Sequence, residues 1–205
     1  MPHRATRLAI LSPLALLSAA HAAPILTQAA DGYTWSTITQ PGNRATNASE
    51  HWWDPSFSAG SVSYEYRMAT TEVTGAQWYE FVQAYAPYIG AAYFDSSFWG
   101  ATVFVGFDAQ GVPRYVMDPK NANVPVTVGW RYAARFCNWL HNEKALTQPA
   151  FENGAYDTST FTRNPDGSFN DQRAHHADAR YWIPTMDEWI KAAHYDPNRY
   201  GEGQD

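Results

Sequence analysis

Large aromatic side chains are the feature that most limits how this chain can fold. Tryptophan, tyrosine and phenylalanine make up 16% of its residues and charged residues only 17%, against about 25% charged in an average soluble domain. Packed rings rather than ion pairs are therefore expected to hold the fold. Because glycines and polar turns separate the rings, the composition favours an α+β domain with many irregular loops over a helical bundle.

The first residues have the pattern of an export signal. A basic start precedes an apolar run from Leu8 to Ala20, and Ala20-His21-Ala22 is a small-x-small cleavage pattern. The run is interrupted by Pro13 and is too short to cross about 30 Å of hydrocarbon. We expect residues 1–22 to be a signal peptide, the mature protein to be periplasmic or secreted, and no membrane span to remain after cleavage.

Charge and cysteine content narrow the possible partners. Cleavage after Ala22 removes two of the 14 basic side chains and leaves 12 against 20 acidic ones, a formal charge of −8, so nucleic acid is not an expected partner. Cys137 is the only cysteine, so no intramolecular disulfide can form. We expect one domain, with 23–60 as its N-terminal segment of strands and loops and 61–205 as its main part.

Strand patterns occur at three places. Residues 33–38 are β-prone, and in 61–66 the alternation predicts a half-buried strand with Val62, Tyr64 and Tyr66 on its inner side. Residues 102–107 and 112–117 flank an Asp-Ala-Gln-Gly turn, which predicts a hairpin. The polar stretch 151–179 is expected to be a long surface connection.

Three helices are predicted, two of them with a capping box. Thr74 with Gln77 and Thr185 with Glu188 have the spacing in which each side chain bonds the other's backbone. We assign Thr74, Thr185 and Glu188 to helix capping and not to catalysis. The first helix has an apolar stripe of Trp78, Phe81, Val82 and Tyr85 and ends before Pro87. The second spans 130–142 and the third runs to about residue 195. The expected buried face of the second helix consists of Trp130, Ala133, Ala134, Cys137 and Leu140, and Asn138 is expected off that face. The expected buried face of the third helix consists of Trp189, Ala192 and Ala193.

Three segments carry a family resemblance. They are YRMATTEVTGAQW at 66–78, VPVTVGW at 124–130 continuing to FCNWL at 136–140, and IPTMDEW at 183–189 followed by KAA at 191–193. In this order they resemble the formylglycine-generating enzyme, or sulfatase-modifying factor, family. The resemblance implies an irregular fold similar to a C-type lectin. It covers roughly residues 61–200 and implies an N-terminal portion only, because the family's active site lies in a C-terminal portion without a counterpart here.

Some residues depart from the family pattern. Trp182-Ile183 stands where the family has arginine-leucine, and Met186 and Ile190 replace acidic residues around the tryptophan. These differences indicate a divergent, exported subfamily.

The resemblance also implies copper chemistry, which this chain cannot supply in the family's way. The family's enzyme oxidises a substrate cysteine to formylglycine with copper held by two cysteines, since thiolates suit monovalent copper. Cys137 is alone and lies in an apolar helix stripe. A core role is therefore favoured for it over a ligand or nucleophile role.

Other candidate ligands are weighed against structural roles. His175, His176 and Asp178 could bind zinc or iron, but adjacent residues of an extended segment point to opposite sides. His194 is expected to be an ordinary surface residue. Structural calcium is implied by the resemblance, and Asp157, Asp166, Asn170 and Asp171 could bind it through oxygen, although their spacing is not that of an EF-hand and turn roles are favoured.

Two functions from different classes remain open. No serine-histidine-aspartate order, phosphate-binding loop or H-E-x-x-H motif is present. One hypothesis is a sulfatase-modifying-factor-like domain that is catalytically incomplete in this chain. The other is a lectin-like module that binds a glycan, peptide or partner protein. Trp52-Trp53 and the rings at 93, 94, 98 and 99 could line its groove, although core packing or a subunit contact is favoured for these rings.

Overall fold

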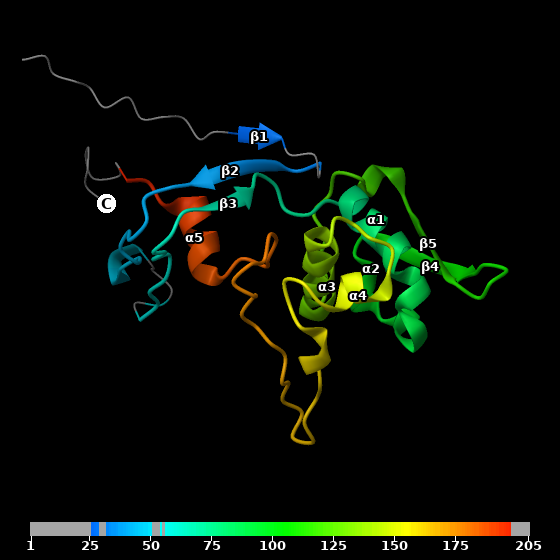
Figure 1. Ribbon diagram of the computed structural model, residues 1–205. Helices are drawn as coiled ribbons and strands as arrows, with labels where there is room; N and C mark the ends of the chain where they lie inside the picture. Colours follow the sequence, from blue (N-terminus) through cyan, green and yellow to red (C-terminus); the bar gives the residue numbers. More distant parts are fainter. Residues whose placement is uncertain (1–25, 29–31, 51–53, 55, 198–205) are drawn as a thin grey trace, which may run out of the picture.

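A computed structural model of the chain describes residues 26–28, 32–50, 54 and 56–197, and these form a mixed α and β fold (Figure 1). The expected signal peptide lies outside the described residues. The strands are β1 (Leu26–Gln28), β2 (Thr34–Ile38), β3 (Tyr66–Ala69), β4 (Thr102–Phe107) and β5 (Pro113–Met117). The α-helices are α1 (Gly75–Tyr85), α2 (Ser96–Trp99), α3 (Trp130–His141), α4 (Gln148–Glu152) and α5 (Met186–His194). Within the described ranges, no helix is long and apolar enough to cross a membrane.

The strands form two antiparallel sheets on different sides of the fold. The first has the order β1-β2-β3 and the second is the β4-β5 hairpin. Figure 1 shows the three-stranded sheet with α5 on one side, the hairpin with α1 and α2 on the other, and α3 between them. The predicted α+β class, the strand at 33–38 and the hairpin are confirmed.

The strand predicted at 61–66 is wrong in its position. The regular strand begins only at Tyr66, and Tyr64 is 46% exposed, whereas Val62 and Tyr66 are buried. Residues 61–65 have no strand partner among the described residues. They run along α5 instead, where the Tyr64 hydroxyl donates to Glu188 Oε1 at 2.9 Å. The alternating pattern was therefore produced by contacts with a helix, not by a pleated sheet.

Helix α1 begins at the predicted place and forms the centre of the core. Thr74 is its N-cap, and the capping box with Gln77 is present. Trp78 is only 1% exposed, and its indole N–H donates to the Phe98 carbonyl at 2.8 Å. Gly100 has a φ of +56°, and a Cβ there would lie 2.6 Å from a Trp78 ring carbon. Glycine is thus required at this position both by its backbone conformation and by the ring beside it.

Helix α3 is buried on two faces, which the single predicted stripe did not anticipate. Tyr132, Phe136 and Trp139 enter the main core, and Ala134 and Cys137 enter a second cluster with Ala155 and Tyr156. Asn138 was expected off the buried face but is fully buried. Its side chain donates to the Tyr156 carbonyl and accepts the Tyr156 N–H, bonds that a neighbouring backbone would otherwise make.

Helix α5 begins as predicted but buries a different face. Its N-cap is Thr185 and the capping box with Glu188 is present. Trp189 is 47% exposed and Ala193 is also exposed, while Glu188 and Lys191 are 1% and 2% exposed. A buried charge is tolerated only when it has partners. Glu188 and Lys191 have partners on neighbouring segments, so these two charged residues pack inward together with Ile190.

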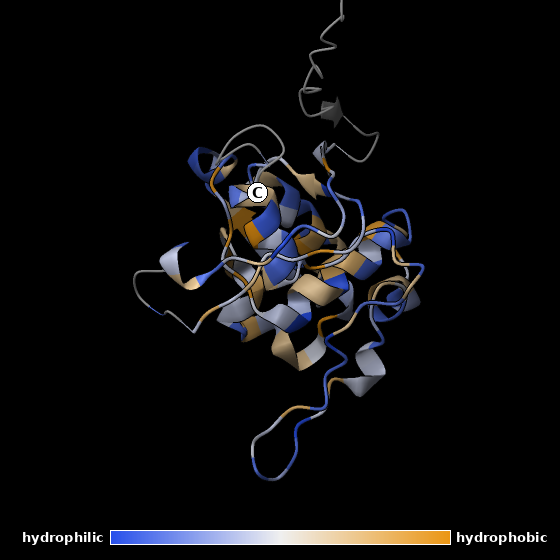
Figure 2. Cartoon of the chain, turned by 90° about the vertical axis from the view of Figure 1, so that its left-hand side faces the viewer, coloured by the Kyte–Doolittle hydropathy of each residue, from blue (hydrophilic) through white to orange (hydrophobic). Residues whose placement is uncertain are grey.

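The stretch 151–179 is only partly the surface connection that was expected. Phe151, Ala155 and Tyr156 are buried, because α4 and the residues after it cover α3. Beyond them the chain is mainly loop, with an isolated bridge between Arg163 and Phe169 around the predicted turn. Figure 2 shows the loop that projects from the body as largely hydrophilic.

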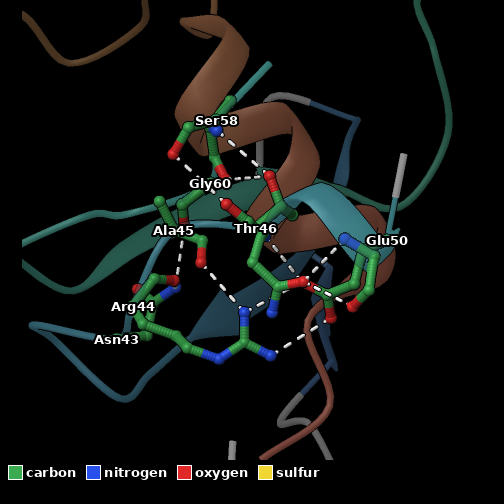
Figure 3. Close-up of polar contacts among 10 residues, drawn as sticks. Asn43, Arg44, Ala45, Thr46, Glu50, Ser58 and Gly60 are labelled. Carbon is green, nitrogen blue, oxygen red and sulfur yellow. Dashed lines mark hydrogen bonds and ion pairs between the residues drawn. The ribbon is translucent and has the colours of Figure 1, made fainter. Parts of the chain in front are cut away.

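Hydrogen bonds and an ion pair among residues 43–60 hold together the segment that precedes β3 (Figure 3). Arg44 donates to both carboxylate oxygens of Glu50, at 2.9 and 3.1 Å. The Thr46 hydroxyl donates to the Ala59 carbonyl at 3.0 Å, and Asn43 Nδ2 donates to the Gly60 carbonyl at 2.6 Å. Asp187 then accepts the Gly60 N–H at 2.7 Å, which attaches the segment to α5.

A candidate ligand-binding groove

A cavity in the described part of the chain has a volume of about 800 Å³ and is open to solvent. This lies within the usual range of about 300–1,000 Å³ for ligand sites. Rings and charged side chains dominate its lining. The residues are Trp35, Glu65, Tyr66, Arg67, Leu140, Glu143, Lys144, Arg180, Tyr181 and Trp182.

Four segments distant in sequence form the walls. They are β2 through Trp35, β3 with the residue before it, the C-terminal end of α3 with the residues that follow it, and the segment 180–182. Glu65, Tyr66 and Arg67 are consecutive, yet all three line the cavity. Since neighbouring strand residues point to opposite faces, this wall is formed by the backbone edge of the strand as well as by side chains.

The rings of the groove are held by α5 and by each other. Trp35 and Tyr181 lie with ring centroids 5.9 Å apart. The Trp182 indole N–H donates to Glu188 Oε1 at 3.0 Å, and the Tyr66 hydroxyl donates to the Glu188 carbonyl at 2.5 Å. Burial, together with the nearby Glu188 carboxylate, raises the pKa of Tyr66, so this hydroxyl is a donor at neutral pH.

The charged residues of the groove differ in their partners. Arg180 pairs with Glu143 at 2.9 Å, and Lys144 pairs with Glu80 at 2.7 Å. For Arg67, by contrast, the described residues include no hydrogen-bond or ion-pair partner of the guanidinium. A cation without a partner in an open cavity remains available to an anionic group of a ligand.

Lys191 supports the groove from behind without lining it. Its ammonium donates to the Gln40 carbonyl at 2.8 Å and to the Val62 carbonyl at 3.4 Å. Desolvation by burial lowers the pKa of this amine. It also borders a much smaller cavity of about 60 Å³ between α5 and the segment 43–60, a volume that suits a water molecule rather than a substrate.

Cys137 does not fit a copper centre of the two-thiolate kind. Its side chain is free, 7% exposed and packed among the apolar residues of the second cluster. Burial raises the pKa of the thiol to about 12, so it is protonated at neutral pH and a poor ligand. The sequence offers no second thiol to join it.

The structure does not bring the histidine candidates together as ligands. His175 stacks on Trp182 at 4.7 Å, and its Nδ1 contacts the His176 carbonyl at 2.7 Å. His176 Nδ1 contacts the Gly154 carbonyl at 2.9 Å. His194 lies on the surface against Trp189, and among the residues described there is no group of three His, Cys, Asp or Glu, including Asp178, that could hold a metal ion.

The residues considered for calcium have protein partners. Asp157 accepts the Ser159 N–H, and Asp166 accepts both the N–H and the hydroxyl of Ser168. The carboxylate of Asp171 forms two bonds with Arg131, at 3.0 and 2.7 Å. Asn170 bonds Asn164 and Thr162. These oxygens stabilise turns and one ion pair, and the geometry does not fit a shared calcium site.

The aromatic residues considered as lining for a ligand groove lie in different surroundings in the structure. Trp52 and Trp53 lie outside the described residues. Phe98 is fully buried in the core, Tyr93 and Trp99 are half-buried, and Phe94 is exposed beside Phe104 of the hairpin. None of these four lines the groove.

The family model described as "Sulfatase-modifying factor enzyme 1-like domain" matches residues 27–205. The chain therefore belongs to the sulfatase-modifying factor family. The matched range includes residues 27–60, which precede the three segments on which the resemblance rests. No curated protein and no solved structure matches the chain.

Sequence reasoning missed the groove itself. Arg67 and Tyr66 belong to a segment that carried the family resemblance, but nothing local marks them as facing a cavity. Glu143, Lys144 and Arg180 resemble ordinary surface charges in sequence. One usable signal was the replacement of the family's arginine-leucine by Trp182-Ile183, because Trp182 is a groove residue.

Proposed function

We propose that this chain is an exported, lectin-like member of the family that binds a ligand in the groove and forms no formylglycine by itself. The observation that supports this proposal is a groove of about 800 Å³ lined by four rings and by Arg67, whose guanidinium has no partner among the described residues, in a chain whose only thiol is buried. Rings that stack with charges between them suit a glycan or a peptide. The irregular loops between short elements support the lectin-like classification.

A binding screen tests the first part. Tryptophan fluorescence is recorded while glycans and peptides are added, because Trp35 and Trp182 line the groove. A ligand of the groove should lose affinity in Trp35→Ala and keep it in Trp189→Ala, whose ring is exposed on α5 outside the groove. Circular dichroism establishes that both variants are folded. Equal losses in the two variants, or no binder in a folded sample, would refute the groove as a binding site.

An activity assay tests the second part. The chain is incubated with copper and a cysteine-containing peptide, and aldehyde formation is followed by mass spectrometry. We expect none, because a single protonated thiol cannot provide two thiolate ligands. Copper-dependent aldehyde formation would contradict the proposal. If it survives in Cys137→Ala, the copper is not bound by a thiolate of this chain.

Export is tested by expression of the full sequence in a bacterium with two membranes. Mature protein in the periplasm or medium, with an N-terminus at Ala23, is the expected result. Retention of uncut protein in the cytoplasm would contradict it.

A further inference from the structure

The strand β3 is an edge strand whose residues Tyr66 and Arg67 line the groove. β2 and β3 pair with Thr37 opposite Arg67 and Ile38 opposite Tyr66, and the Thr70 N–H donates to the Thr34 carbonyl at 2.9 Å just beyond the strand. In an antiparallel pair, bonded and non-bonded positions alternate. Thr70, Met68 and Tyr66 therefore face β2, and the N–H and C=O of Arg67 point outward.

These outward groups have no partner within the described part of the chain. β3 is the last strand in the order β1-β2-β3, and no described residue donates to or accepts from the Arg67 backbone on this side. Arg180, Tyr181 and Trp182 line the same cavity as the strand, and no hydrogen bond between them and the Arg67 backbone is present. An exposed strand edge of this kind is a template for another extended chain.

The side chains along this edge carry opposite charges two residues apart. Arg67 and Glu65 both line the groove. Neither has a direct ion pair with a described residue, although the Lys191 ammonium interacts with the Glu65 carboxylate electrostatically. In an added strand, the residue opposite Arg67 would have its Cα about 5.5 Å away and its side chain on the same face. An antiparallel ligand therefore meets Arg67 first and Glu65 two residues later.

We propose that the groove binds an extended polypeptide segment as an antiparallel fourth strand on the Glu65–Arg67 edge. The segment carries an acidic residue opposite Arg67 and a basic residue two positions toward its C-terminus, opposite Glu65. This inference rests on the proposed binding function of the groove and specifies its ligand. The backbone edge supplies affinity, and the alternating charges set the direction and register.

Peptides of identical composition test the proposal. Two peptides are titrated into the ¹⁵N-labelled full chain: acetyl-Thr-Glu-Val-Lys-Thr-amide and its order-reversed counterpart acetyl-Thr-Lys-Val-Glu-Thr-amide. Binding is measured from the shifts of the backbone amide signals of residues 65–67. We expect the acid-first peptide to bind about tenfold more tightly, since reversal places like charges opposite each other twice. The double variant Glu65→Arg with Arg67→Glu should invert that preference.

N-methylated peptides test the backbone contact separately. Methylation of the glutamate nitrogen removes the N–H that donates to the Arg67 carbonyl, whereas methylation of the valine nitrogen removes one that faces away. Only the first methylation should weaken binding, again by about tenfold.

The outcomes separate the two proposals. If the groove binds peptides of both orders equally and both methylated peptides equally, strand addition is wrong while ligand binding in the groove stands. If glycans bind and neither peptide does, the inference fails and the proposed function survives. If nothing binds the folded chain, both fail.

Discussion

The Trp182 indole N–H and the Glu188 carboxylate are joined by a hydrogen bond of 3.0 Å that connects the groove wall to α5. The same oxygen accepts the Tyr64 hydroxyl at 2.9 Å, and the other oxygen accepts the Thr185 N–H at 2.7 Å. Glu188 thus completes the capping box of the helix and fixes the position of a groove ring.

Glu188→Gln is expected to destabilise the fold and to move Trp182. An amide presents one acceptor and one donor where three donors converge, so at least one buried donor loses its partner at a cost of about 1–3 kcal/mol. Urea unfolding measures the loss, and the indole ¹⁵N–¹H signal of Trp182 should shift. Glu143→Gln is the matched control. Its carboxylate is mostly exposed and pairs with Arg180 at the surface, so a change of at most about 1 kcal/mol is expected. Equal effects in the two variants would contradict the role given to Glu188.

Trp78 and Trp189 each follow a threonine-capped helix start, but they should differ greatly in their contribution to stability. Trp78 is surrounded by core rings, including Phe81 at 4.9 Å and Phe136 at 5.3 Å. Trp78→Ala should reduce the free energy of unfolding by about 3–5 kcal/mol. Trp189→Ala should cost at most about 1 kcal/mol, because Trp189 is 47% exposed and its ring lies against His194 at the surface. A large loss in Trp189→Ala would place the ring in a core instead.

Cys137 should make the protein less stable at alkaline pH. Burial raises the pKa of its thiol from 9.0 to about 12, so the folded state keeps the proton that the unfolded chain releases. This contribution is fully present below pH 9 and is lost as the pH rises through about 12, by at most about 1.4 kcal/mol per pH unit. The slope of unfolding free energy against pH in this window should be shallower in Cys137→Ala. Tyr64 and Tyr115, also with pKa values raised to about 12, titrate alike in both proteins. Identical slopes would show that the thiol is accessible.

Asn138 should be among the most sensitive polar positions. Its side chain accepts the Tyr156 N–H at 2.7 Å and donates to the carbonyls of Tyr156 and Phe151 at 2.9 and 3.1 Å. Asn138→Ala leaves three buried backbone groups without partners, and a loss of about 2–4 kcal/mol is expected in urea unfolding. Asn164→Ala removes exposed bonds in the projecting loop and should change stability by about 0.5 kcal/mol or less. Comparable losses would mean that Asn138 is reached by water.

Local signals in the sequence predicted where α1 and α5 begin and where the hairpin turns. Thr74 with Gln77 and Thr185 with Glu188 act within one helical turn, and the hairpin turn acts within a few residues, so the responsible atoms are close in the chain. The same is true of the apolar stripe of α1. The family assignment followed from these segments in their order.

Which faces are buried depended on partners distant in the chain. Glu188 is buried because Tyr64 and Trp182 donate to it, and Lys191 because Gln40 and Val62 accept from it, across as many as 151 positions. Residue type alone favoured Trp189 as the buried residue of α5.

The sequence by itself determined where α1, α3 and α5 begin and where the hairpin turns, that rings would form the core, and that only one thiol exists; the short helices α2 and α4 were not among its predictions. Tertiary structure alone decided that β3 lines a cavity together with α3 and residues 180–182, and that neither its outer edge nor the Arg67 guanidinium has a partner among the residues that the structure describes. The physical reason is that propensity and capping act over one turn of chain, whereas a groove exists only once segments far apart in the sequence have packed around it.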